Sequence, residues 1–454
     1  MAERTARAKM RRRVDPHAQE EPGDRAAPSP AVERDDLLKG LGMPDVSTSH
    51  SAPAHPYADL GTTKKVLLVA TTFTSYMLFA VAWNWGDMYV TSLGFSASRT
   101  AVMTNAITLA QVVGSIVAAN VIVQLGTRKA YTLAGALIVF GGLVSLTQAF
   151  PLVFFIRFVM GLGGALMVVM GSAIAAKVLT GRDLQIANGI GSVAFNTGLA
   201  VAITFGVRFS GRPTIAVVIA ATLSIILLVT WLVVSKMVLK PEQAQEAAVD
   251  HSYTMADGFK EWFNWVFALA YTGLLSYYIV AFTFMDPSTI RWVIYAGIVG
   301  ALSGTVVSAR VEDRLKPVIV VWSALAQVIA AASVLALAGH RLEVLIGVIL
   351  GFVIFFPMPF FVQTAFIRPG VTPRQIAVTF SIFWAVSYAG SVFIIQIFAW
   401  IADATGGLIP GSNVPVSVAP MIFIVIAEAS FLIGTFFIWR WFKAQNAFSE
   451  EITA

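Results

Sequence analysis

The chain has 454 residues, of which 57% are hydrophobic and only 12% are charged, and its mean hydropathy is +0.76. A soluble globular protein carries about 25% charged residues, so this composition excludes a protein with a fully hydrated surface, and it equally excludes a wholly disordered chain. The absence of cysteine excludes disulfide scaffolds, thiolate metal sites and cysteine nucleophiles. We therefore expect an all-α polytopic membrane protein.

The N-terminal segment differs from the rest of the chain. Residues 1–65 are rich in charge and proline and contain no apolar run. Such a segment cannot bury enough apolar surface to offset the entropy of ordering. We predict that it is a disordered cytoplasmic tail.

Twelve apolar runs follow, each close to the roughly 20 residues that span a bilayer as a helix. The first six are predicted at 66–89, 99–122, 130–149, 152–176, 186–207 and 213–237. The other six are predicted at 263–285, 290–309, 317–338, 344–367, 376–401 and 418–441. A hydrophilic stretch separates the two sets, as in transporters built from two repeated halves. The predicted organisation is a six-helix bundle (66–238), a cytoplasmic linker (239–261), a second six-helix bundle (262–442) and a cytoplasmic tail (443–454).

The distribution of Lys and Arg predicts the orientation, because cytoplasmic loops carry an excess of both. With the N-terminus inside, 16 of these residues flank spans on the cytoplasmic side and five lie outside. We expect both termini in the cytoplasm and the protein in the cell membrane, so the net charge of +6 reflects topology and not nucleic-acid binding. The expected partners are the lipid bilayer, a small-molecule substrate and protons; we expect a monomer with no cofactor, no metal and no nucleic acid.

Two short basic turns occupy matching places in the two halves. Gly126, Arg128 and Lys129 lie between the second and third spans, and Asp313 and Arg314 lie between the eighth and ninth. Such turns can hold the two halves together by pairing with acids and helix ends. We predict a gating role for these residues, although the general excess of positive charge on the inner side explains any one of them alone.

The fourth span carries an arginine followed by glycines, Arg157, Gly161, Gly163 and Gly164. A charge within a span is costly and is by default a functional candidate. Small residues on one flank of the helix allow close packing.

These residues resemble the motifs of the major facilitator superfamily, over roughly residues 66–442. The turn Gly126 to Lys129 is similar to the end of the family's loop 2–3 motif, although Val123 replaces its usual acid, and the loop 8–9 version retains Asp313. Arg157, Gly161 and Gly163 match the family's span-4 motif. The resemblance implies alternating access, with spans 1, 4, 7 and 10 lining a central cavity.

Resemblance to particular branches of the superfamily is more limited. The fifth span lacks the Gly-Pro step of drug/proton antiporters, and the acidic-proline motif of sugar porters is absent after the sixth span. The stretch from Trp384 to Asp403 and Gly406 resembles bacterial organic-anion and cyanate-type permeases.

Asp87 and Arg157 lie at similar depths when each residue contributes about 1.5 Å of rise, so the two can pair if they face one another. Trp83 and Asn84 lie on nearly the same helical face as Asp87. An unpaired charge in hydrocarbon costs about 2.5–3.5 kcal/mol or more. An ion pair or a water-filled cavity is one interpretation, and a helix cap in the headgroup region is the other.

Glu428 is the most deeply placed acid, near the middle of the last span. Burial favours the neutral form of such a group, which suits a proton carrier. Because the last span is peripheral in the resembled fold, a structural hydrogen bond to Gln327 or Gln396 is an equal alternative.

The remaining candidates are polar, aromatic or helix-breaking residues in spans 5, 7, 10 and 11. Two prolines in span 10 remove backbone donors and are tolerated where a cavity or gate is lined. All five histidines lie in tails or loops, and no lysine lies deep within a span. Arg157 is therefore the main buried cation, and it suits an anionic substrate. The further candidates for substrate binding or coupling are Asn196, Tyr277, Gln363 and Trp384. The further candidates for gating are Pro357 and Pro359.

The sequence predicts a secondary active transporter of a small organic solute, with an organic anion and proton symport through Asp87 or Glu428 as the leading hypothesis. Proton-coupled efflux of lipophilic compounds is the first alternative. A non-transporting membrane sensor or scaffold is the second. An enzyme is not expected, because no span carries a nucleophile–base pair or a metal-ligand cluster.

Overall fold

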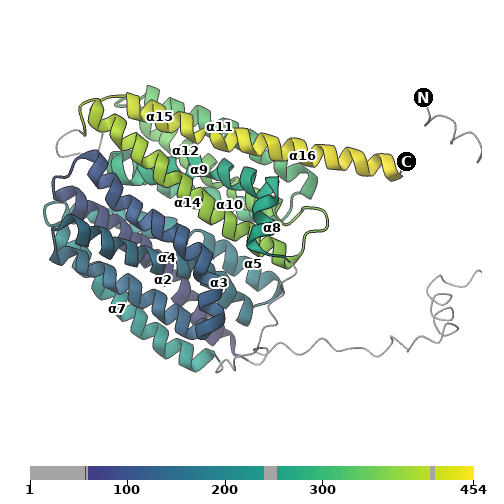
Figure 1. Ribbon diagram of the computed structural model, residues 1–454, viewed down its shortest axis with the longest axis horizontal. Coiled ribbons are helices and arrows are strands. Elements are labelled where there is room, and N and C mark those ends of the chain that lie inside the picture. The colour runs from purple at the N-terminus through teal and green to yellow at the C-terminus, as the bar shows by residue number, and fades with distance from the viewer. Residues whose placement is uncertain (1–56, 58–59, 240–252, 409–414, 454) are drawn as a thin grey trace, which may run out of the picture. The chain divides into compact units, whose positions relative to one another are not determined.

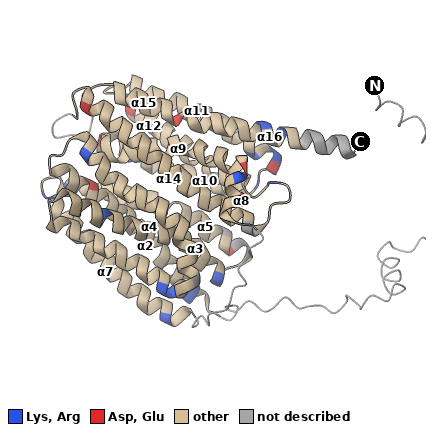
Figure 2. Ribbon diagram, in the orientation of Figure 1, with Lys and Arg blue, Asp and Glu red and all other residues tan. Residues whose placement is uncertain are grey.

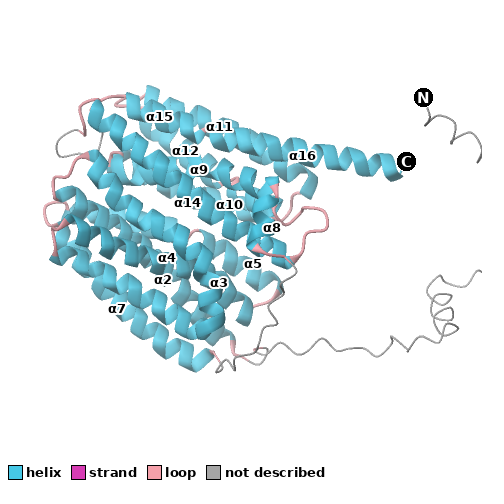
Figure 3. Ribbon diagram, in the orientation of Figure 1, coloured by secondary structure: helices cyan, strands magenta, loops and turns pink. Residues whose placement is uncertain are grey.

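A computed structural model describes residue 57 and residues 60–239, 253–408 and 415–453. Within these ranges the chain is helical, and its extended backbone pairs in a single isolated bridge between Leu408 and Pro415 (Figure 3). The predicted tail, apart from its last residues, and the linker residues 240–252 lie outside the described residues.

Twelve helical segments are long and apolar enough to cross a membrane, as the sequence predicts. The first six spans, here called the first bundle, are formed by α2 (Thr62–Ser92), α3 (Ala97–Gly141), α4 (Phe150–Val178), α5 (Gly181–Ser192), α6 (Ala194–Gly206) and α7 (Pro213–Val238), with 3-10 turns η1 (Gly142–Leu146) and η2 (Val207–Phe209). A short helix, α8 (Met255–Lys260), lies between α7 and the second bundle in the chain.

The second bundle is formed by α9 (Trp262–Phe284), α10 (Pro287–Ser308), α11 (Lys316–Ala336), α12 (Glu343–Phe355), α13 (Met358–Thr364), α14 (Pro373–Ala404), α15 (Ala419–Glu428) and α16 (Ser430–Thr453), with 3-10 turn η3 (Asp313–Leu315). The helix α2 begins at Thr62, slightly before the predicted span, and α16 continues to Thr453 through the segment expected to be a tail.

Local sequence explains where several helices begin. The Ser96 hydroxyl accepts a hydrogen bond from the Arg99 N–H at the start of α3, and Asp286 caps α10, which opens with a proline. Thr372 and Gln375 form a capping box at the start of α14. These residues satisfy N–H groups that have no partner within the helix, and proline fits the first turn because it lacks that N–H.

The helix α8 is held in the same way outside the membrane spans. Thr254 and Asp257 form a capping box in which each accepts a hydrogen bond from the other's backbone N–H. The side chain and backbone of Thr254, followed by Lys260, hold the pKa of the exposed Asp257 carboxyl below its usual range.

The helices pack in two groups (Figure 1). In the first bundle α3 packs on α4, and α2 packs on α6 and α7; in the second, α9 packs on α14 and α16, and α10 packs on α12. Between the groups, α3 contacts α14 and α6 contacts α10. In the most apolar stretch of α9, 83% of the residues are buried, whereas in those of α7 and α11 only 28% are buried. The helices α7 and α11 therefore present apolar side chains to the outside, as lipid-facing helices do.

Charge gathers at the ends of the bundles, and the middle of the helices is almost free of it (Figure 2). One end carries Lys64, Lys177, Lys236, Arg310 and Arg368 in or beside its turns. We call this the basic end, and the end at which α2 finishes and α3 begins the opposite end. The sequence predicts that the basic end faces the cytoplasm.

The glycines of α4 allow two neighbouring helices, α2 and α3, to approach it. A Cβ at Gly161 would lie 2.8 Å from the Ile107 carbonyl oxygen and 2.7 Å from the Ala110 Cβ on α3. A Cβ at Gly163 would lie 2.6 Å from the Ala134 carbonyl oxygen, and one at Gly164 would enter the ring of Phe79 on α2. Gly161 and Gly163 are therefore required by contact with the backbone of α3, and Gly164 by contact with the Phe79 side chain. This is the close packing that the sequence predicts from small residues.

Replacing Gly161 with alanine is expected to destabilise the protein by about 1–3 kcal/mol, the usual cost of overpacking. Gly171 on the same helix is a matched control, because a Cβ there would meet no atom within 4 Å. Thermal unfolding in detergent should therefore separate Gly161→Ala from Gly171→Ala. Equal melting temperatures for the two variants would contradict the packing assignment.

Candidate functional site

A buried ion pair joins Asp87 of α2 to Arg157 of α4. The Arg157 Nη2 donates to the Asp87 Oδ1, and the two residues are 1% and 3% exposed. The Arg157 Nε also donates to the carbonyl oxygen of Met103 at 2.9 Å. The structure thus brings together the two charges that the sequence places at similar depths.

Two threonines complete the surroundings of the Asp87 carboxylate. The Thr104 hydroxyl of α3 donates to Oδ1 at 3.2 Å, and the Thr283 hydroxyl of α9 donates to Oδ2 at 3.5 Å. The second contact crosses from one bundle to the other. The Asp87 carboxylate therefore accepts one of its hydrogen bonds across the interface between the bundles. Sequence reasoning missed both threonines, because a hydroxyl in a span carries no signal of its own.

Two buried donors close to this pair have no hydrogen-bond partner in the part of the chain that the structure describes. They are Arg157 Nη1 and Trp83 Nε1. Arg157 Nη1 rests against Gly86, where a Cβ would lie 2.7 Å away, and Trp83 lies one turn earlier on α2. A buried donor without a partner costs about 1–3 kcal/mol. One donor belongs to α4 and the other to α2, and each would be stabilised by a ligand oxygen.

An aromatic cluster lies beside the donors at the bundle interface. The indole of Trp83 packs edge-on against Phe195 of α6 and Phe282 of α9, with ring centroids 5.7 Å apart in each case. Asn84 donates to the Phe282 carbonyl oxygen at 3.4 Å. Phe79 and Tyr76 extend the cluster along α2. The site is consequently apolar around a few polar groups, which is typical of small-molecule sites.

Asn196 also lies at the interface, where its Oδ1 accepts a hydrogen bond of 2.5 Å from the Tyr278 hydroxyl. Tyr277, the tyrosine selected from the sequence, is the preceding residue of α9 and is also buried. Adjacent residues on a helix point about 100° apart, so only one of this tyrosine pair can face the first bundle.

The other candidates of the second bundle lie away from the ion pair. Glu428 accepts a hydrogen bond from Gln327 Nε2, and this contact joins α15 to α11. Gln363 donates to the Ser308 hydroxyl at 3.1 Å, joining α13 to α10. Trp384 is half-buried and stacks on Tyr388 of the same helix, with an edge contact to Tyr271. The structure does not bring these three residues to Asp87 and Arg157.

The predicted gating turns make local contacts. Gly126 has a φ of +73°, which lets the chain turn between spans 2 and 3. Asp313 pairs with Lys316 and Arg314 with Glu312, each at 2.5 Å and within the same loop. Arg128 is half-buried and Lys129 is exposed. The contacts described for these residues therefore lie within one bundle and do not join the two bundles.

The two prolines of span 10 interrupt it as expected. The helix α12 ends at Phe355, and α13 begins after Pro357 with Pro359 in its first turn. The neighbouring α10 carries Gly300 at this level, where a Cβ would lie 2.6 Å from the Phe352 carbonyl oxygen. The interruption thus occurs where two backbones meet closely.

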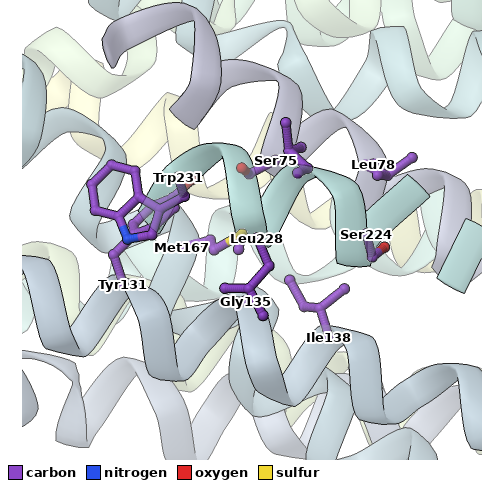
Figure 4. Close-up of a pocket in the computed structure, with 10 residues that line it drawn as sticks. Ser75, Leu78, Tyr131, Gly135, Ile138, Met167, Ser224, Leu228 and Trp231 are labelled. Atoms are coloured by element: carbon purple, nitrogen blue, oxygen red, sulfur yellow. The ribbon is translucent and has the colours of Figure 1, made fainter. Parts of the chain in front are cut away.

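A pocket within the first bundle is separate from this site (Figure 4). It is lined mainly by apolar side chains of α2, α3, α4 and α7, including Leu78, Ile138, Met167 and Leu228. Its Ser75 and Ser224 hydroxyls each donate to a carbonyl oxygen one turn earlier in their own helices. This pocket therefore offers a ligand little hydrogen bonding. Among the described residues, no group of His, Cys, Asp and Glu side chains is arranged to hold a metal ion.

Comparisons with other proteins agree with this architecture. Over 225 residues, 47% of this chain and 67% of the relative, the chain is 25% identical to Cj0987c, an uncharacterized protein of Campylobacter jejuni. A mutant of the nucleoside transporter NupG superposes with a TM-score of 0.64 at 14% identity, covering 83% of this chain and 98% of NupG. A mutant of FucP, the fucose:proton symporter of E. coli, gives 0.55 at 12% identity, covering 83% and 99%. Residues 66–395 match the family model of the Major Facilitator Superfamily, and the chain is a multi-pass membrane transporter belonging to that family.

Proposed function

We propose that the protein is a proton-coupled symporter of a small organic anion, in which Asp87 takes up the proton and Arg157 binds the anionic group. The observation that carries this proposal is the buried Asp87–Arg157 ion pair, which contacts Thr283 across the bundle interface.

The electrostatics of the pair support a coupling of one proton to one negative charge. With Asp87 ionised the pair is neutral overall, as a site removed from water must be to avoid a large desolvation cost. Protonation of Asp87 leaves Arg157 uncompensated. A substrate carboxylate restores neutrality, so the proton and the anion are each favoured by the presence of the other.

The unpartnered donors support an oxygen-bearing substrate. Arg157 Nη1 and Trp83 Nε1 are buried donors beside the ion pair. Arg157 Nη1 offers one N–H to a substrate carboxylate, and Nη2 offers a parallel second one once protonation of Asp87 releases it. The indole N–H adds a third donor. The ring cluster of Trp83, Phe195 and Phe282 suits an apolar body on the same substrate.

The second candidate is proton-coupled export of lipophilic compounds, which the same aromatic cluster favours. The structural neighbours NupG and FucP are a nucleoside transporter and a fucose:proton symporter. We further propose that the basic end faces the cytoplasm of a cell membrane, on the distribution of Lys and Arg.

Purified protein in liposomes, with a pH-sensitive dye in the lumen, tests these alternatives. The external panel consists of small carboxylates, uncharged polar solutes and lipophilic cations. Acidification of the lumen by carboxylates is the expected result. Alkalinisation with lipophilic cations would replace symport by export, and acidification by uncharged solutes alone would remove the anion from the proposal. Empty liposomes and liposomes containing Arg157→Ala serve as controls.

A further inference from the structure

At the opposite end, a single carboxylate of the second bundle binds the start of a helix of the first. Asp403, one residue before the end of α14, accepts hydrogen bonds from the backbone N–H of Ala97 at 2.9 Å and of Ser98 at 3.0 Å. Ala97 and Ser98 are the first two residues of α3.

The N–H groups at the start of α3 are thereby accounted for. The Arg99 N–H donates to the Ser96 hydroxyl and the Thr100 N–H to the Ser96 carbonyl oxygen. Only the Ala97 and Ser98 N–H groups depend on the other bundle. A carboxylate at this position gains two charge-assisted hydrogen bonds and a favourable interaction with the helix dipole.

The contact continues along both helices at a spacing of seven residues. Gln396 donates to the Ser98 carbonyl oxygen at 3.4 Å, and Asn105 donates to the Val392 carbonyl oxygen at 3.0 Å and to Gln396 at 3.4 Å. Seven residues are two helical turns, so these side chains lie on one face of each helix. Asp403, Gln396 and Asn105 thus form a row of polar contacts between α3 and α14. Asp403 is its charged member and lies nearest the opposite end.

We propose that Asp403 is a latch that holds the opposite end closed, and that its release from the start of α3 is required for that end to open. The proposal rests on the family assignment and is independent of the substrate and coupling proposed above. Removing the latch should therefore shift the balance between the two ends without any ligand.

The absence of cysteine makes the chain suitable for paired spin labels. Ser210→Cys with Ala338→Cys reports on the opposite end, and Thr180→Cys with Arg310→Cys reports on the basic end; all four positions are exposed. In Asp403→Asn we expect the long-distance population of the opposite-end pair to rise about tenfold. The basic-end pair should shorten in the same fraction of molecules.

Glu343→Gln is a matched control. Glu343 lies at the same end and accepts hydrogen bonds from Thr289 and from the Gly339 N–H, all within the second bundle. Its removal should leave both distance distributions unchanged. A shift equal to that of Asp403→Asn would show a general effect of charge and would overturn the latch.

Ala97→Pro tests the same contact from the other side. It removes one N–H donor and keeps the Asp403 charge. Proline is tolerated at the first helical position, and Ser96 has the extended backbone that a residue before proline requires (φ −61°, ψ 164°). We expect a smaller shift in the same direction. Unchanged distances in Ala97→Pro, and in Asp403→Asn where it folds, would contradict the proposal.

Discussion

Arg157→Ala is expected to lower transport by at least about 100-fold while the protein still inserts into the membrane and folds. Removing one partner of a buried ion pair costs about 3–5 kcal/mol when the other charge stays uncompensated, but Asp87 can take up a proton and become neutral. The loss should therefore appear in substrate binding and transport more than in yield. Uptake of radiolabelled substrate into liposomes and size-exclusion profiles in detergent measure the two effects.

Arg157→Lys separates charge from geometry. It keeps the positive charge but loses the guanidinium plane, whose Nε binds the Met103 carbonyl oxygen and whose Nη2 binds Asp87. We expect transport at least about tenfold below that of the unaltered protein. Arg208→Ala is the control, because Arg208 is exposed at the opposite end and packs over Phe205. Full activity of Arg157→Ala would reduce Arg157 to a packing residue.

Asp87→Asn is expected to abolish proton-driven accumulation and to retain exchange of substrate across the membrane. Asparagine resembles the protonated carboxyl, so Arg157 stays available for a substrate anion but no proton can be released. Without substrate the buried Arg157 charge is uncompensated, and the melting temperature should fall. Saturating substrate should then stabilise Asp87→Asn more than the unaltered protein, since a ligand stabilises the state that it binds.

Glu428→Gln is the matched comparison for Asp87→Asn. Both variants replace a buried acid by its amide, but Glu428 contacts Gln327 within the second bundle and has no described contact with the first. We expect accumulation and its pH dependence to be retained, because glutamine can still hydrogen-bond Gln327. If Glu428→Gln lost its pH dependence and Asp87→Asn retained it, the proton-carrying role would belong to Glu428 and not to Asp87.

The twelve spans could be predicted from the sequence because a bilayer imposes a length on every crossing. Backbone polar groups in lipid must be satisfied within the helix, so long apolar runs have one available structure. The predicted bounds differ from the observed ones mainly at the ends, as at Thr62 and in the long α16. Arg157 was also recognisable because a charge is rare and costly inside a span. The glycines of α4 were recognisable because small residues on one flank of a span favour close helix packing.

Depth along a helix could likewise be predicted from residue number, and Asp87 and Arg157 were placed at similar depths for this reason. The direction of each side chain could not. In a soluble helix the polar face marks the outside, whereas in lipid both the outer and the inner faces are apolar. Tyr277 and Tyr278 illustrate why the direction of a side chain could not be predicted. The sequence offers no ground for choosing between them, and only the packing of the helices places Tyr278 at Asn196.

Composition and hydropathy by themselves determined the membrane class, the number of spans and the positions of the rare charges, because each follows from the cost of exposing polar groups to lipid. Only the tertiary structure decided which charges and hydroxyls meet. Thr283 at Asp87 and Asp403 at the start of α3 join residues 196 and 306 positions apart. Contacts of this kind depend on the rotation of each helix about its axis, and that rotation is set by close packing against neighbouring helices and not by hydropathy.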